Sequence, residues 1–190
     1  MEPKVTIAIN AARLAAKEIH KFSRRRDKIN IFEKGPTDFV TNSDIKVERI
    51  IIEELSKAKP NFSLISEENG IVKNKDDSNT WIIDPIDGTN NFIHGIPHHC
   101  VSIAMQFRGK TELAVIYNPY LDQLFTATKG SGAQLNGQRI RVANRKDFSG
   151  CLFSGALKYS KKVFTNTYPE AVLDLHKEIS GLRYSGSLAL

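Results

Sequence analysis

The sequence predicts an α+β fold in which helices precede a largely antiparallel sheet. In the first part of the chain, apolar residues recur at three- and four-residue spacing, which indicates amphipathic helices. From Phe62 onward they recur at two-residue spacing in short runs that turn residues separate, which indicates strands. Because the helices come before the strands instead of alternating with them, a parallel doubly wound sheet is not expected.

Two helices are expected at the start of the chain. Residues 4–23 carry apolar side chains along one helical face. A second run with the same spacing follows Ser43 and Asp44, which are suitable N-cap residues, and Pro60 lies just beyond its expected end.

Strands are expected after these helices, at 62–66, 81–84, 100–108, 112–117, 123–128, 133–135 and 138–142. Asn136-Gly137 is a strong hairpin signal because both residues tolerate positive φ. The region from 100 to 142 is therefore predicted to form an antiparallel meander.

The pattern changes again beyond Gly150. It predicts a strand at 151–154, a helix near 161–179 and a strand at 181–184. Polar residues just before Gly150 favour a boundary that divides the chain into residues 1–148 and 149–190.

Composition limits the classes of protein to consider. The chain has 190 residues, of which 41% are hydrophobic, enough for one domain with a core. It has neither the roughly 20-residue apolar run of a membrane span nor the apolar core of a secretory signal, so a cytoplasmic protein without a membrane partner is expected. The net charge of +6 suits an anionic substrate or a polyanionic partner. Direct nucleic-acid binding is not expected, because the dense basic cluster Arg24-Arg25-Arg26 lacks interleaved aromatic residues.

Four carboxylates flank a short apolar run. Glu67 and Glu68 precede Trp81–Ile83, and Asp84 and Asp87 follow it. A nearly continuous apolar run is typical of a strand buried on both faces, so the aspartates would lie at its C-terminal end, where side chains can enter a crevice. Two carboxylates this close repel each other unless a cation lies between them or one is protonated.

A hard divalent cation would resolve this repulsion. Mg²⁺ prefers oxygen ligands, and Asp84, Asp87, a glutamate from 67–68 and a carbonyl between the aspartates make a suitable set. Pro85 is expected to stop the interior strand, and Gly88 can adopt positive φ and let its amide approach an anion. The alternative is an ordinary turn at Asp87-Gly88 beside a solvated loop at 67–68.

Three segments resemble motifs of the inositol monophosphatase family. "WIIDPIDGTNNFIHGIP", from Trp81 to Pro97, is similar to its metal- and phosphate-binding signature, and "KGPTDFVTNSD" and "LISEENG" resemble its two upstream elements in the expected order. Similarity to the bacterial extragenic suppressor type extends through "LFTATKGSGAQLNG". The resemblance implies a layered αβαβα phosphatase sandwich with a largely antiparallel sheet.

The resemblance also implies a Mg²⁺-dependent hydrolysis of phosphate monoesters such as inositol 1-phosphate, with sensitivity to lithium. Glu67, Asp84 and the main-chain carbonyl of Ile86 would hold one Mg²⁺, and Asp84 and Asp87 would share a second. Two cations neutralise the charge of the ester, and one can generate a hydroxide nucleophile by lowering the pKa of its bound water.

The same resemblance assigns the groups that contact substrate and water. The amides of Gly88 and Thr89 would receive the phosphate, with Asp87 on the substrate side. Glu67 and Thr89 would orient the attacking water. Asp44 would accept a hydrogen bond from the Thr89 hydroxyl, which makes Thr89 a better acceptor toward that water.

Three further residues receive supporting roles. Glu68 would stand behind the metal ligands or bind a third metal weakly. Lys34 would lie on a mobile loop over the site, and the alternative is a solvent-facing lysine. Arg183, in "LRYSGSLAL", would face substrate or a subunit interface, and the alternative is an isolated surface residue.

Family members continue beyond the position of Leu190 and supply a further aspartate ligand there. The resemblance therefore implies incomplete C-terminal layers and an activity that the missing ligand impairs. It also implies a small phosphorylated polyol as substrate and a homodimer. Two alternatives stay open: a non-catalytic module that contacts the transcription machinery in ribosomal RNA antitermination, and an inactive truncated gene product.

Overall fold

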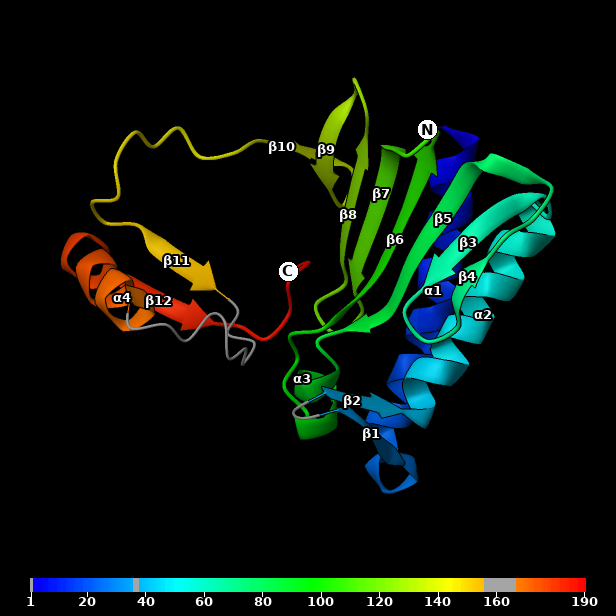
Figure 1. Ribbon diagram of the computed structural model, residues 1–190, viewed down its shortest axis with the longest axis horizontal. Helices are drawn as coiled ribbons and strands as arrows, with labels where there is room; N and C mark the ends of the chain where they lie inside the picture. The colour runs from blue at the N-terminus through cyan, green and yellow to red at the C-terminus, as the bar shows by residue number, and fades with distance from the viewer. Residues whose placement is uncertain (1, 36–37, 156–166) are drawn as a thin grey trace.

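The computed structural model describes residues 2–35, 38–155 and 167–190. Within them, an eight-stranded sheet has the order β10-β9-β8-β7-β6-β5-β3-β4, and β3 and β5 are its one parallel pair. Two long helices cover one face of this sheet (Figure 1). The predicted α+β class with a largely antiparallel sheet is confirmed. The elements are α1 (Pro3–Arg24), α2 (Asn42–Ala58), β3 (Phe62–Ser66), β4 (Gly70–Val72), β5 (Asp76–Asp87), β6 (Cys100–Phe107), β7 (Lys110–Asn118), β8 (Gln123–Thr128), β9 (Gly132–Leu135) and β10 (Gln138–Ile140).

The core lies between the two helices and the sheet. α1 packs against β6 and β7, whereas α2 packs against β3 and β5. Alternate residues of β6, such as Val101 and Ile103, are fully buried, while Ser102 and Ala104 between them are only partly buried. The two-residue period of the sequence therefore identifies the face of the sheet that the helices cover, and β6 to β10 form the predicted meander.

The N-cap of α2 is Thr41, so the expectation of a cap at Ser43 or Asp44 is wrong. The Thr41 side chain accepts hydrogen bonds from the amides of Ser43 and Asp44, and the Asp44 carboxylate accepts one from the Thr41 amide. This reciprocal capping box satisfies amides that the first helical turn leaves without partners. It also holds the Asp44 side chain in place at the start of the helix.

Strand β5 is longer than the predicted strand at 81–84 and passes through Pro85. Its pairing with β6 shifts register between Asp84 and Asp87, and its parallel pairing with β3 ends at Ile83. Pro85 therefore lies in a bulge, where its missing N–H breaks no ladder hydrogen bond. The expectation of burial on both faces is wrong for Ile82, which is only partly buried.

Several short elements carry no clear periodic signal. A hairpin of β1 (Ile31–Gly35) and β2 (Asp38–Thr41) precedes α2, and a 3-10 turn, η1 (Arg26–Lys28), precedes that hairpin. A short helix, α3 (Thr89–His94), follows β5. The residues of β1 and β4 are mostly exposed, so no alternation of apolar and polar residues marks them.

A second body follows β10. β11 (Leu152–Gly155) pairs in parallel with β12 (Gly181–Tyr184), and α4 (Thr167–Glu178) connects them. The predicted start of this helix near 161 lies outside the described residues. This body lies beside the sheet, and the chain then returns toward α3 and the end of β5 (Figure 1). The boundary near residue 148 stays a prediction.

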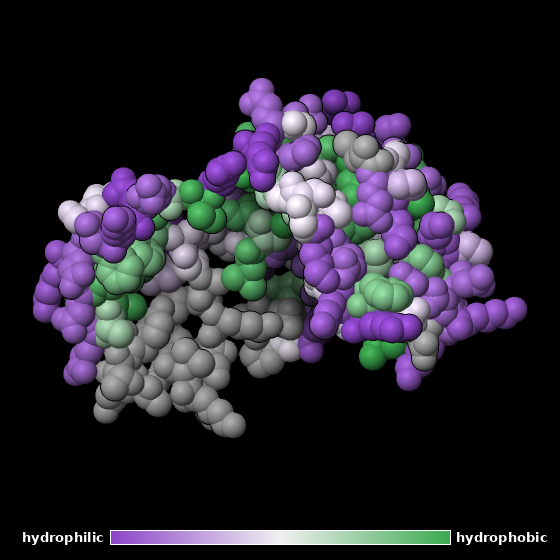
Figure 2. All heavy atoms as spheres, turned by 90° about the horizontal axis from the view of Figure 1, so that it is seen from above, coloured by the Kyte–Doolittle hydropathy of each residue, from purple (hydrophilic) through white to green (hydrophobic). Residues whose placement is uncertain are grey.

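The surface differs between the outer sides and the side where the two bodies face each other. On the face that Figure 2 shows, apolar side chains gather between the two bodies, whereas the outer parts of that face are predominantly hydrophilic. Val142, Leu152, Leu173 and Tyr184 are exposed apolar residues of the second body and of the segment that leads to it. Among the described residues, no helix is both long and apolar enough to cross a bilayer.

Candidate metal and phosphate site

The parallel pair of strands brings acidic residues together at one edge of the sheet. β3 and β5 run in the same direction, so their C-terminal ends meet there. Glu67 directly follows β3, and its amide donates to the carbonyl of Ile83 at 3.2 Å. Asp84 and Asp87 lie at the corresponding end of β5. Residues far apart in the sequence thus place their carboxylates side by side.

Asp84 has the most perturbed electrostatics of this group. Burial raises the pKa of its carboxyl group, and the neighbouring carboxylates of Glu67 and Asp87 raise it further, to about 8. Its Oδ1 atom is buried without a hydrogen-bond partner in the described part of the chain. An unpaired buried oxygen beside two acidic groups is an arrangement that a hard cation stabilises.

Asp87 is held by a segment that lies 100 residues downstream. One carboxylate oxygen accepts hydrogen bonds from the Ser187 hydroxyl and, at 2.8 Å, from the Ala189 amide. The other accepts from the Leu188 amide at 3.2 Å. The contact between Ser187 and Asp87 is not predicted from the sequence, in which Ser187 is visible only as a small residue beside Gly186.

Thr89 and Asp44 form the part of the site nearest to α2. The Thr89 hydroxyl lies 3.2 Å from Asp44 Oδ1 and 3.1 Å from the carbonyl oxygen of Ile86, both acceptors. The capping box holds the other oxygen of Asp44. Burial raises the pKa of Asp44, and the hydrogen bonds from Thr41 and Thr89 oppose that rise. The structure thus joins Thr89 and Asp44 as the resemblance implies.

Gly88 allows the chain to turn from β5 into α3. Its φ is +92°, a conformation that residues with a Cβ rarely adopt. A Cβ placed there would lie 3.1 Å from the carbonyl oxygen of His98 and 3.3 Å from the Cβ of Ser187. Only glycine fits at this crowded position without a shift of its neighbours.

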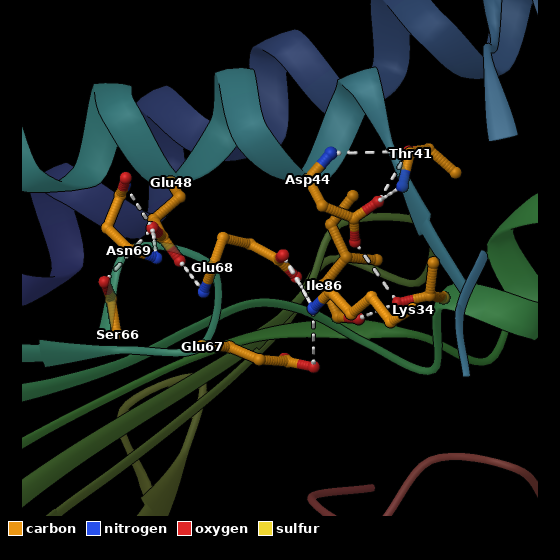
Figure 3. A network of polar contacts seen from close by, with 10 residues as sticks. Lys34, Thr41, Asp44, Glu48, Ser66, Glu67, Glu68, Asn69 and Ile86 are labelled. Carbon is orange, nitrogen blue, oxygen red and sulfur yellow. Dashed lines mark hydrogen bonds and ion pairs between the residues drawn. The ribbon is translucent and has the colours of Figure 1, made fainter. Parts of the chain in front are cut away.

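Lys34 extends from β1 toward the two glutamates (Figure 3). Its Nζ atom lies 2.6 Å from Glu68 Oε2 and 3.8 Å from Glu67 Oε1. Burial raises the pKa of Glu68, and the nearby lysine opposes that rise. Lys34 and Glu68 therefore form an ion pair with each other, next to Glu67.

Comparison with known proteins fits this arrangement. The model of the inositol monophosphatase family matches residues 1–189. The chain belongs to the inositol monophosphatase family. Its similarity to the bacterial suppressor type is also clear, because it is 43% identical to the Nus factor SuhB of Vibrio cholerae and 42% identical to that of Escherichia coli K12. Both matches cover all of this chain and 71% of the relative.

Solved structures of the family share the fold. The extragenic suppressor protein suhB of Bartonella henselae superposes with a TM-score of 0.92 at 38% identity, over 97% of this chain and 70% of that one. The IMPase of Thermotoga maritima gives 0.85 at 29% identity, over 98% of this chain and 69% of that one. The family and the fold class expected from the sequence are therefore confirmed.

Enzymes of the inositol monophosphatase family generally use Mg²⁺. The donors present here fit this ion, because they are carboxylates and a carbonyl and because Asp84 has an oxygen without a partner. In the described ranges, no three acidic, histidine or cysteine side chains already form a closed metal cluster. Lys34 and the 187–189 segment occupy oxygens of Glu68 and Asp87 instead.

Arg183 is not joined to the carboxylates by any interaction between described residues. It is exposed on β12, and its guanidinium group donates to the carbonyl of Leu182 at 3.0 Å. The substrate or interface role that the family resemblance gives it stays a prediction.

His99 is a buried base next to this site, and we expect it to make stability depend on pH. Burial lowers its pKa, helped by the charges of His20 and His98, although a hydrogen bond to the Ile96 carbonyl opposes this. As the pH falls below the ordinary histidine pKa of 6.5, the unfolded chain binds a proton that the folded chain binds less readily. The free energy of unfolding should therefore fall between pH 7.5 and 5.5.

Urea denaturation across this pH range checks the expectation. A His99→Gln variant should lose part of the pH dependence of unfolding. His176→Gln, which removes an exposed histidine of α4, should keep it. Equal pH dependence in the wild type and His99→Gln would contradict the assignment.

Proposed function

We propose that this chain carries the site of a Mg²⁺-dependent phosphate monoesterase. A small phosphorylated polyol such as inositol 1-phosphate is the proposed substrate. The observation that carries the proposal is the meeting of Glu67, Asp84 and Asp87 at one edge of the sheet, beside the hydrogen-bonded pair of Thr89 and Asp44. Family membership and the family fold support the same class of reaction.

The acidic residues are the proposed metal ligands. Glu67, Asp84 and the carbonyl of Ile86 would hold one Mg²⁺, and Asp84 with Asp87 would hold another. Bound Mg²⁺ neutralises charge on the ester and makes a coordinated water more acidic. The amides of Gly88 and Thr89 would then bind the phosphate oxygens.

Thr89 has the role of orienting the attacking water. Its hydroxyl hydrogen can point to Asp44, which leaves oxygen lone pairs free to accept a hydrogen bond from water. The Glu67 carboxylate provides a second acceptor for the same water. Asp44 acts through Thr89 and is therefore a positioning residue.

Replacing Thr89 with alanine tests this role. We expect kcat for phosphate release from inositol 1-phosphate to fall by about 100-fold, because proton-accepting groups contribute roughly 10²–10⁴-fold. KM should change little, since the backbone amide remains. Malachite-green detection of released phosphate, with Mg²⁺ or with EDTA, provides the measurement.

Thr111→Ala is the matched control, because Thr111 is an exposed threonine of β7. The role of Thr89 is refuted if both variants keep wild-type kcat. The enzymatic proposal itself fails if the wild type releases no more phosphate with Mg²⁺ than with EDTA. Inhibition by lithium would support a site of the family type.

The names of the relatives favour a second function. Both sequence relatives described above are called Nus factor, and the net charge of +6 here suits a polyanionic assembly. We propose that the chain also contacts the transcription machinery, independently of catalysis. An Asp87→Asn variant should therefore retain RNA polymerase components in a pulldown as well as the wild type does. The proposal is rejected if neither the wild type nor Asp87→Asn retains them.

A homodimer is also proposed, and light scattering measures the mass in solution that checks it.

A further inference from the structure

Glu48 is a buried acidic residue whose only side-chain hydrogen-bond partners in the described structure are the last residue of β3 and the segment that follows it. It lies on α2 and is 0% exposed. Its Oε1 accepts from the Ser66 hydroxyl at 3.1 Å and from the Asn69 amide at 3.0 Å, and its Oε2 accepts from the Glu68 amide at 2.9 Å. The Asn69 side-chain amide also donates to Oε1. Figure 3 shows Glu48 pointing from the helix toward these groups.

Packing alone does not explain an acidic side chain at this place. Val47, Ile51 and Leu55 show that buried positions of α2 take apolar residues. Burying a carboxylate is costly unless hydrogen bonds compensate it, and Glu48 obtains its hydrogen bonds from the backbone and side chains of residues 66–69. Its specific effect is therefore to fix that segment.

The fixed segment contains Glu67. Glu48 binds the residue before it, Ser66, and the residue after it, Glu68. β3 ends at Ser66 and β4 begins only at Gly70. Among the described backbone bonds, the sheet holds the residues between them through the Glu67 amide alone, which donates to the Ile83 carbonyl. With both flanking residues anchored, the Glu67 side chain is directed to the edge where Asp84 lies.

α2 thus presents two carboxylates that act on different parts of the site. Asp44 and Glu48 are four residues apart, so they lie one above the other on the same helix face. Asp44 contacts Thr89, and Glu48 contacts the segment that carries Glu67. One rigid helix therefore aligns a proposed metal ligand with the proposed water-orienting hydroxyl.

We propose that Glu48 is a positioning residue for metal binding, which sets the affinity for Mg²⁺ by holding Glu67 toward Asp84. The inference rests on the proposed Mg²⁺-dependent function. Groups that orient metal ligands typically account for about 10- to 100-fold in metal affinity. Glu48→Gln keeps the volume of the side chain but places an amide N–H₂ against groups that are themselves donors.

The chain offers a matched control in Glu18. This residue of α1 is also buried, at 6% exposed, and it pairs with Lys21 and Lys46 instead of the site. Glu18→Gln removes a buried carboxylate and lowers stability without touching residues 66–69. Comparison of the two variants separates an effect on the site from a general loss of stability.

Hydrogen exchange of the metal-free protein is the first measurement. In Glu48→Gln, at least one of the amides of Glu68 and Asn69 should exchange about 10-fold or more faster than in the wild type, because glutamine keeps one acceptor oxygen and places a donor where the other was. Glu18→Gln should leave these two amides unchanged. Unchanged exchange in Glu48→Gln would overturn the inference, whatever the protein does with metal.

Isothermal titration with MgCl₂ is the second measurement. Glu48→Gln should bind Mg²⁺ about 10- to 100-fold more weakly than the wild type, and Glu18→Gln should bind it equally well. Equal affinity in Glu48→Gln and the wild type overturns the inference while leaving the proposed function intact. A wild type without Mg²⁺ binding overturns the proposed function, and with it the metal role of Glu48.

Circular dichroism shows whether each variant is folded. If Glu48→Gln does not fold, Glu48→Asp takes its place, because it keeps the charge and withdraws it by one methylene. Its amides at 68 and 69 should then exchange faster and its Mg²⁺ affinity should fall, and wild-type values for both would refute the role.

Discussion

Replacing Asp84 with asparagine is expected to reduce phosphatase activity by about 100-fold or more and to stabilise the metal-free protein at the same time. Activity falls because a proposed ligand of both metals loses its charge, and loss of metal-based stabilisation of several kcal/mol corresponds to about two or more powers of ten in rate. Stability rises because asparagine removes the charge that is buried beside Glu67 and Asp87, and its amide N–H₂ can donate to those carboxylates.

The expected gain in the free energy of unfolding in EDTA is about 1–3 kcal/mol, because each pKa unit of unfavourable burial and repulsion corresponds to about 1.4 kcal/mol. Urea denaturation in EDTA measures the gain, and phosphate release measures the loss. Asp27→Asn, at an exposed site in η1, should change neither quantity. If Asp84→Asn is less stable than the wild type without metal, the electrostatic account of the site is wrong.

Gly88→Ala is expected to lower the free energy of unfolding by about 2–5 kcal/mol, because two costs add. An alanine with a φ of +92° is strained by about 1–2 kcal/mol. Its Cβ would also press on the His98 carbonyl and on Ser187, and overpacking of this kind costs a further 1–3 kcal/mol or so. The displacement of Ser187 should loosen the segment that holds Asp87.

Gly109→Ala provides the control for the first cost alone. Gly109 has a φ of +73°, but a Cβ there would meet no atom within 4 Å. Its loss should be about 1 kcal/mol. Chemical denaturation of both variants distinguishes the terms, and equal losses would show that the contacts around Gly88 are unimportant.

Most of the fold can be predicted from local patterns in the sequence. The helix spacing and the two-residue spacing depend only on neighbouring residues, so α1, α2 and the meander from β6 to β10 follow from them. The position of the α2 cap does not follow, because Thr41, Asn42, Ser43 and Asp44 are all suitable capping residues in a row. Backbone geometry decides among them.

Some features of the candidate site can be predicted from the sequence, and others cannot. The paired acidic residues around Trp81–Ile83 are visible as a local motif. The bulge that admits Pro85 is not, because it depends on the register with β6. Nor does the sequence reveal Glu48, which looks like an ordinary charge on an amphipathic helix until its burial and its partners after β3 are known.

The hydrogen bonds that hold Asp87 have a consequence for the order in which parts of the protein fold. Ser187, Leu188 and Ala189 meet a residue that lies 100 to 102 positions earlier, whereas most of the sheet pairs strands that are neighbours in sequence. Closing so long a loop costs more chain entropy than closing any hairpin of the meander, and contacts this distant form slowly. We therefore expect the sheet to form before the contacts to Asp87, and the candidate site to be completed late in folding.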